Sequence, residues 1–169
     1  MFGITPTGRT GFVLGFLACA GALVFAYYLE YFHGLEPCPM CIFQRIAMAA
    51  TGLGFLLGIF IARPTWGRWL AGIIALVGTI AGAIIAGRHV WLQSLPEDKV
   101  PACGPPLETL TNMMPWIEVF QVVLRGDGNC AVIDAAFLGL SLPAWTFIAF
   151  VGLGLWALFC AFTSGQKSN

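Results

Sequence analysis

Residues 38–62 read CPMCIFQRIAMAATGLGFLLGIFIA and join a Cys-x-x-Cys pair to a long apolar run. At a rise of 1.5 Å per residue, a helix needs about 20 apolar residues to cross a membrane, with a range of about 17–25. The run 46–62 meets this need, and we expect it to be helical because backbone in lipid must satisfy its own hydrogen bonds. The two thiols therefore lie where a membrane helix meets water.

The whole chain has the composition of an integral membrane protein. Of its 169 residues, 59% are hydrophobic and 9% are charged, and the mean hydropathy is +0.85. Soluble domains have about 45–50% apolar and about 25% charged residues. The net charge is zero, so nothing indicates binding to nucleic acid. We predict one integral membrane domain, 1–169, with an all-α fold: a four-transmembrane-helix bundle whose spans are 11–29, 46–62, 69–86 and 145–162.

The first run has a second interpretation, because Arg9 precedes it as a basic residue precedes a cleaved signal peptide. Its apolar length exceeds the roughly 7–15 residues of a signal peptide core, so we expect an uncleaved span.

Glycines recur in the other runs, for example Gly54, Gly78 and Gly82. They suit close packing of helices, although simple tolerance of glycine in membrane helices explains them equally well.

The distribution of basic residues predicts the topology. With four spans, both termini share one side, which carries Arg9, Arg63, Arg68 and Lys167 and no acidic residue. The positive-inside rule places this side in the cytoplasm. The short loop, 30–45, and the long loop, 87–144, then face outward. In a bacterium the chain would be a multi-pass protein of the inner membrane with these loops in the periplasm.

Four cysteines fall in these outer loops: Cys38, Cys41, Cys103 and Cys130. The periplasm is oxidising, and of the three pairings that four cysteines allow, the short spacer favours Cys38–Cys41 and leaves Cys103–Cys130. Two dithiols on one membrane face indicate electron transfer through disulfides, whereas the alternative is a pair of structural staples. Cys19 and Cys160 lie within spans and are expected to be packing thiols.

We expect no metal site at the Cys-x-x-Cys pair. The sequence has no second Cys-x-x-Cys, and His33 is the histidine near the pair along the chain. Structural zinc sites usually take four cysteine or histidine ligands. His33 has no identifiable partner and is interpreted as structural.

The residues around Cys41 favour a reactive thiol. Proline suits the first turn of a helix, so Pro39 predicts that Cys41 lies at the N-terminus of the second span, where the helix dipole favours thiolate. Arg45 follows at i+4, on the same helix face. It can stabilise that thiolate or bind a polar oxygen of a lipid-soluble ligand, or it can simply snorkel to lipid headgroups. His89, at the end of the third span, is a candidate proton donor or a plain boundary residue.

The long loop has three parts. Residues 96–106 are rich in proline around Cys103 and are expected to be extended and mobile. The stretch 115–124 predicts a short interfacial helix with Trp116, Val119, Phe120 and Val123 buried along the membrane surface. Residues 126–129, GDGN, form a turn signal just before Cys130.

Taken together, these features resemble the DsbB family of bacterial disulfide-generating membrane proteins over essentially the whole chain. They are the four spans, the Cys-x-x-Cys of the short loop, the arginine four residues after its second cysteine, the two cysteines of the long loop, and Leu142-Pro143-x-Trp145 before the last span. The spacer Pro39-Met40 departs from the branched apolar spacer typical of the family, which leaves the redox potential of this pair open.

The resemblance implies an electron path. A periplasmic DsbA-like thioredoxin-fold protein attacks Cys103, Cys130 is released, and electrons pass to Cys38–Cys41 through Cys38. Cys41 then reduces a membrane quinone, ubiquinone or menaquinone, in a site that Arg45 and His89 would line.

Two other interpretations stay open. A vitamin K epoxide reductase-like enzyme also has a Cys-x-x-Cys and a loop pair, but in that class the loop pair precedes the Cys-x-x-Cys. A non-catalytic membrane scaffold with stapled loops would neither hold a quinone nor oxidise a dithiol.

Overall fold

The computed structural model describes residues 9–126, 128–133 and 136–163. Four long helices dominate it, each apolar enough to cross a membrane: α1 (Arg9–His33), α2 (Pro39–Ile61), α3 (Thr65–Gln93) and α7 (Leu142–Thr163). The predicted fold class, an all-α four-helix membrane bundle, is confirmed. At the outer ends, α2 begins seven residues before its predicted span and α3 continues seven residues beyond its own, because polar residues near the ends of a helix continue it as readily as apolar ones.

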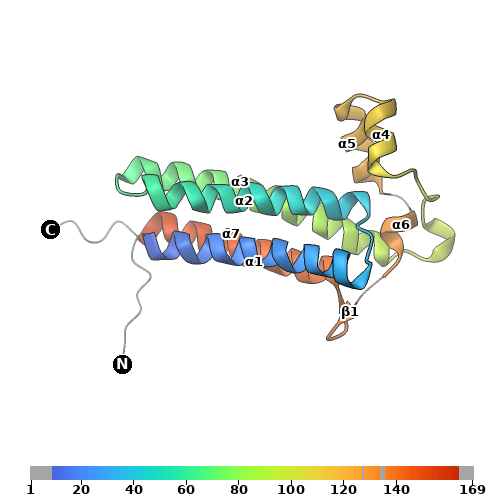
Figure 1. The fold of residues 1–169 in the computed structure, drawn as a ribbon, viewed down its shortest axis with the longest axis horizontal. Helices are drawn as coiled ribbons and strands as arrows, with labels where there is room; N and C mark the ends of the chain where they lie inside the picture. Colours follow the sequence, from blue (N-terminus) through green and yellow to red (C-terminus); the bar gives the residue numbers. More distant parts are fainter. Residues whose placement is uncertain (1–8, 127, 134–135, 164–169) are drawn as a thin grey trace.

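The helices pack in antiparallel fashion, with α2 between α1 and α3, and α3 against α7 (Figure 1). The start of α1 and the end of α7 lie at one end of the bundle. All the segments that carry Cys38, Cys103 and Cys130 lie at the opposite end, which we call the thiol end. Large apolar side chains such as Val24, Val77 and Leu155 are exposed on the outer faces, as expected where lipid is the solvent.

Glycine and proline set the short connection between α1 and α2. Gly34 has a φ of +64° and follows the last residue of α1, a left-handed conformation that commonly ends helices, and the Leu35 amide donates back to the Leu29 carbonyl at 3.4 Å. Pro39 then occupies the first turn of α2, with Cys38 as the N-cap residue. The Cys-x-x-Cys pair is thus fixed to the first turn of a membrane helix.

The long connection from α3 to α7 contains short elements at the thiol end. They are η1 (Glu97–Lys99), α4 (Leu107–Met113), α5 (Trp116–Arg125), α6 (Gly128–Ala131) and an antiparallel hairpin of β1 (Ala136–Phe137) and β2 (Leu140–Ser141). The structure contains the predicted short helix as α5, but the hairpin was not predicted. Gly126, with a φ of +81°, ends α5, and Asp127 of the predicted turn lies outside the described residues.

Helix α5 presents two different faces. Val119 and Val123 are buried against the protein, whereas Trp116 is 69% exposed and Phe120 40% exposed. The Phe120 ring lies 5.8 Å from that of Phe43 on α2. Contact with the protein therefore accounts for two of the four residues expected to be buried, and the burial of the other two in a membrane surface stays a prediction.

Close approach of α2 and α3 explains the glycines. A Cβ added at Gly54 would lie 2.5 Å from the backbone nitrogen of Ala75, and one at Gly78 would lie 2.6 Å from Thr51 Oγ1. Such separations are shorter than any normal contact, so these glycines are needed for packing and are more than tolerated. Small residues of this kind let membrane helices associate through van der Waals contact.

This packing predicts a specific cost for Gly54→Ala. The added methyl meets backbone, so α2 and α3 must move apart, and overpacking of this kind costs about 1–3 kcal/mol. Gly152→Ala on α7 is the matched control, since a Cβ there meets nothing within 4 Å. Thermal unfolding in detergent should show a clearly lower Tm for Gly54→Ala and an unchanged or higher Tm for Gly152→Ala. Equal Tm values for the two variants would contradict the packing.

Candidate active site

The Cys-x-x-Cys pair lies at the N-terminus of α2, as predicted, with Cys38 as N-cap and Cys41 one turn later. The two Sγ atoms are 3.5 Å apart. Backbone N–H groups of the first helical turn have no partner within the helix, and together with the helix dipole they favour a thiolate at this end. The first turn of α2 thus favours a reactive thiol pair.

His89 of α3 reaches this pair from the opposite helix. Its Nε2 atom lies 3.8 Å from Cys38 Sγ and 3.0 Å from the Cys130 carbonyl oxygen, and its Nδ1 atom lies 3.0 Å from the Gln44 side-chain amide. The imidazole is 2% exposed. The histidine beside the pair in space is therefore His89, 51 residues from Cys38 in the chain, and not His33, which is the nearer histidine along the sequence. The His33 ring instead packs against Tyr28.

Cys130 completes a cluster that joins both loops. It belongs to α6, which packs on α3, and its side chain is 1% exposed. Cys38 Sγ, a ring nitrogen of His89 and Cys130 Sγ all lie within 4.8 Å of one another. One sulfur from each predicted dithiol therefore stands within a short movement of the other, in the place where a disulfide exchange between the loops would occur.

Cys103 lies outside this cluster and is exposed. Of the segment 96–106 that was predicted to be extended, Glu97–Lys99 form the short helix η1, whereas residues 101–106 around Cys103 belong to no helix or strand. Two hydrogen bonds attach this part to α6: Gly128 N–H donates to the Ala102 carbonyl and the Asn129 amide donates to the Gly104 carbonyl, each at 3.3 Å. The predicted mobility of this arm is not tested by these contacts. They place the exposed thiol directly above the helix that carries Cys130.

Cys19 and Cys160 belong to the hydrophobic core of the bundle, apart from this cluster. They are 1% and 2% exposed, in agreement with their interpretation as packing thiols.

A large cavity opens on the other side of the Cys-x-x-Cys pair. It measures about 620 Å³ and lies between α1, α2, α7 and the β-hairpin. Its polar lining includes Cys41, Gln44 and Arg45, and most of the remaining lining is apolar and aromatic: Phe25, Leu29, Met48, Phe137 and Trp145 among others. Arg45 lines this cavity and His89 does not, so the structure does not bring the two side chains together at one site.

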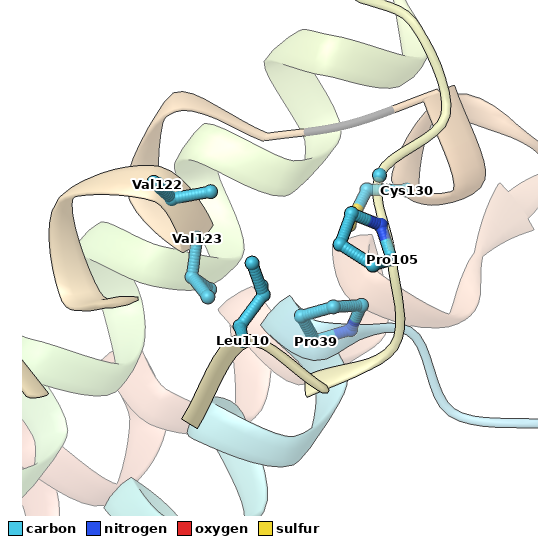
Figure 2. A pocket seen from close by; sticks show the side chains of 7 residues that line it. Pro39, Pro105, Leu110, Val122, Val123 and Cys130 are labelled. Atoms are coloured by element: carbon cyan, nitrogen blue, oxygen red, sulfur yellow. The ribbon is translucent and has the colours of Figure 1, made fainter. Parts of the chain in front are cut away.

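A second cavity lies where Pro39, Pro105 and Leu110 meet Val122, Val123 and Cys130 (Figure 2). Its volume is about 30 Å³, enough for about one water molecule. An organic ligand would not fit in it, so the larger cavity is the candidate ligand site.

Arg45 is held against α1. One guanidinium nitrogen pairs with the Glu30 carboxylate, the other donates to the Ala26 carbonyl at 3.2 Å, and the group lies 4.9 Å from the centre of the Tyr27 ring. These contacts fix the planar guanidinium group at the cavity wall. An arginine that only reached out to lipid headgroups would not need such contacts. Glu30 was missed by the sequence reasoning, although it is an isolated acid at the end of the first apolar run.

Comparison with known proteins agrees with this arrangement. The family model described as disulfide bond formation protein DsbB matches residues 8–160. The chain belongs to the DsbB family. It is 50% identical over 161 residues to disulfide bond formation protein B of Xanthomonas euvesicatoria pv. vesicatoria (strain 85-10), covering 95% of this chain and 94% of that protein. It is 47% identical over 152 residues to disulfide bond formation protein B of Hahella chejuensis (strain KCTC 2396), covering 89% and 92%.

Membership of the DsbB family identifies the chemistry as thiol oxidation in disulfide bond formation. It confirms the resemblance noted in the sequence and favours that assignment over both a vitamin K epoxide reductase-like protein and a stapled scaffold.

Proposed function

We propose that the chain reoxidises a periplasmic DsbA-like dithiol protein and passes the electrons through two disulfides to a membrane quinone. The position of Cys41 carries this proposal: its sulfur lies 3.5 Å from Cys38 and its residue lines the large cavity. A thiol that touches both the partner cysteine and a lipid-side cavity can connect aqueous disulfide exchange to a lipid-soluble acceptor.

The proposed relay begins with two balanced thiol–disulfide exchanges. A thiolate of the partner attacks Cys103 of a Cys103–Cys130 disulfide, and the second partner thiol then displaces Cys103, so the partner leaves oxidised and this pair holds two electrons. Cys130 next attacks Cys38 of a Cys38–Cys41 disulfide, releasing Cys41 as a thiolate, and Cys103 closes the exchange by displacing Cys38. The pair Cys38 and Cys41 then holds the two electrons and two protons.

The cavity fits a quinone. Its volume is within the roughly 300–1,000 Å³ typical of small-ligand sites, and such sites combine apolar walls with a few polar groups. Quinone, when bound, accepts two electrons and two protons. Gln44 and Arg45 would orient its oxygens beside Cys41, since arginine has five N–H donors and the contacts with Glu30 and Ala26 use the two terminal nitrogens. The aromatic residues Trp145 and Phe137 would face its ring.

His89 would act on the thiol exchange. Its Nε2 atom faces Cys38 Sγ, so it can hold a proton beside the thiolate that forms there, and Gln44 fixes the orientation of the ring from the other nitrogen. We propose this role for His89 in place of the contact with the quinone that the family resemblance implied.

The energetics require a strong terminal acceptor. A DsbA-type dithiol has a potential near −120 mV and is itself a strong oxidant, and the bacterial system is driven by quinone. Thioredoxin-like partners with much lower potentials would be oxidised more easily, but only a high-potential acceptor can keep a DsbA-like protein oxidised.

The proposed localisation is a bacterial inner membrane, with both termini in the cytoplasm and the thiol end in the periplasm. Arg63 lies between α2 and α3 and Arg68 lies in the first turn of α3, both at the end opposite the thiols, while Lys167 lies outside the described residues. Reporter fusions test this orientation. A fusion after Asn169 should report cytoplasm and one within 96–106 should report periplasm, and the reverse result would remove the oxidising compartment from the proposal.

The relay predicts different defects for the cysteines. Cys103→Ser should abolish the mixed disulfide with the reduced partner, because the exposed sulfur that the partner attacks is gone. Cys41→Ser should still form that mixed disulfide but should not reduce quinone, because the link to the cavity is lost. Trapping on non-reducing gels and quinone absorbance measure the two steps separately. Cys19→Ala and Cys160→Ala are controls with expected normal turnover, and multiple turnover by Cys41→Ser would disprove the relay.

The quinone site predicts a KM effect at Arg45. Loss of a hydrogen bond to a charged group costs about 1.5–3 kcal/mol, or about ten- to more than a hundredfold in affinity. Arg45→Ala should raise the KM for quinone by that factor, and Arg45→Lys should recover it only in part because lysine lacks the planar donor pair. Formation of the mixed disulfide at Cys103 should stay normal.

The matched control is Arg125→Ala, an exposed arginine at the end of α5. Steady-state rates with quinone varied at fixed reduced partner should show an unchanged KM for this variant. An unchanged KM for Arg45→Ala would assign the quinone to a different place.

A further inference from the structure

We propose that Cys38, His89 and Cys130 of the reduced chain form a binding site for a thiophilic divalent metal ion, Zn²⁺ above all. Two sulfurs and one imidazole nitrogen lie within 4.8 Å of one another. These three ligands come from segments that are far apart in the sequence. The spacing of cysteines and histidines along the chain therefore does not reveal the site. Thiolate and imidazole ligands are the donor set that zinc prefers.

The distances suit a tetrahedral ion. With Zn–S about 2.3 Å and Zn–N about 2.0–2.1 Å, neighbouring ligand atoms around zinc are roughly 3.6–3.8 Å apart. The distance from Cys38 Sγ to His89 Nε2 is 3.8 Å, already within this geometry. The remaining pairs need to close by at most roughly 1 Å, which side-chain rotation of Cys130 can supply.

Burial and charge also favour the ion. His89 and Cys130 are almost fully buried, and Cys38 is partly exposed and provides an entry path. Two thiolates, one neutral imidazole and Zn²⁺ add up to zero net charge, so the filled site avoids the large cost of burying an unpaired charge. The thiols lose their protons on binding, which makes the affinity depend on pH.

Gln44 supplies the outer support that such a histidine needs. A metal-bound histidine usually donates its other ring N–H to an acceptor. The Gln44 amide lies 3.0 Å from His89 Nδ1, and a half-turn of the amide presents its oxygen there. Binding then exchanges the contact between Nε2 and the Cys130 carbonyl for a metal–nitrogen bond.

The site depends on oxidation state, because a Cys38–Cys41 disulfide removes one of its ligands. Metal therefore binds the reduced chain only. If the proposed function holds, an ion on Cys38 and Cys130 occupies both sulfurs that exchange between the loops, and turnover stops until the metal leaves. The binding itself does not depend on that function.

The test uses the full chain in detergent, reduced with a phosphine under anaerobic conditions, with Zn²⁺ for stoichiometry and Co²⁺ as a spectroscopic probe. We expect one metal per reduced chain, thiolate–Co²⁺ charge-transfer bands, and no binding to the oxidised chain. His89→Ala and Cys130→Ser should each weaken binding at least about 100-fold, since even outer-shell losses cost about 10–100-fold.

The matched controls are His33→Ala and Cys103→Ser, which change the other histidine and the exposed loop cysteine and should keep the metal. Cys130→Ser is nearly isosteric and carries the test if His89→Ala does not fold. Loss of metal equally in the controls, binding to the oxidised chain, or no binding at all would overturn the site.

Turnover separates this proposal from the function. Zn²⁺ should slow dithiol oxidation and a chelator should restore it. If turnover is absent even with chelator while metal binding follows the ligand pattern, the proposed function fails and the metal site stands. If turnover proceeds and Zn²⁺ neither binds nor slows it, the metal site fails.

Discussion

The close approach of α2 and α3 is the constraint on which the site depends. A Cβ added at Gly54 would lie 2.5 Å from the backbone nitrogen of Ala75, and one added at Gly78 would lie 2.9 Å from that of Thr51, so there is no room for a side chain at either glycine. This antiparallel contact continues toward the thiol end, where Gln44 of α2 meets His89 of α3. Lipid provides little apolar driving force for such contact, so the absence of Cβ atoms in the middle of the bundle sets the helix spacing that brings a histidine next to Cys38.

The elements that the sequence predicts best are those governed by a single strong rule. Four apolar runs in a chain with few charges allow little besides a helical membrane bundle, and Pro39 predicts the start of α2. The ends of the helices were predicted less well. α3 continues to Gln93 although its apolar run ends earlier, because α5 and α6 cover its outer turns and Arg88 donates to the last carbonyls of α5.

The site residues show the same division. The four cysteines and Arg45 could be found from spacing and local charge. The contact of His89 with Cys38, and of Arg45 with Glu30, depends on which faces of two helices meet, and helix phase across a bundle is not encoded in any local pattern. The family resemblance implied a place for His89 in the quinone site, whereas in the structure its Nε2 atom faces Cys38 and it meets the cavity only through Gln44. The β-hairpin had no signal beyond Gly139, which adopts a φ of +79°.

The geometry of the first turn of α2 explains how the two thiols of one pair can face two different sites. Residues three apart at a helix start bring their sulfurs to 3.5 Å, close enough to form a disulfide after a small rotation. Yet the two side chains leave the helix in different directions. Cys38 faces His89 and Cys130, where water-borne exchange can reach it, and Cys41 faces the apolar cavity beside Arg45. In the proposed relay, electrons would move between the long loop and a ligand in the cavity through the S–S bond of this one pair, without any large movement of the membrane helices.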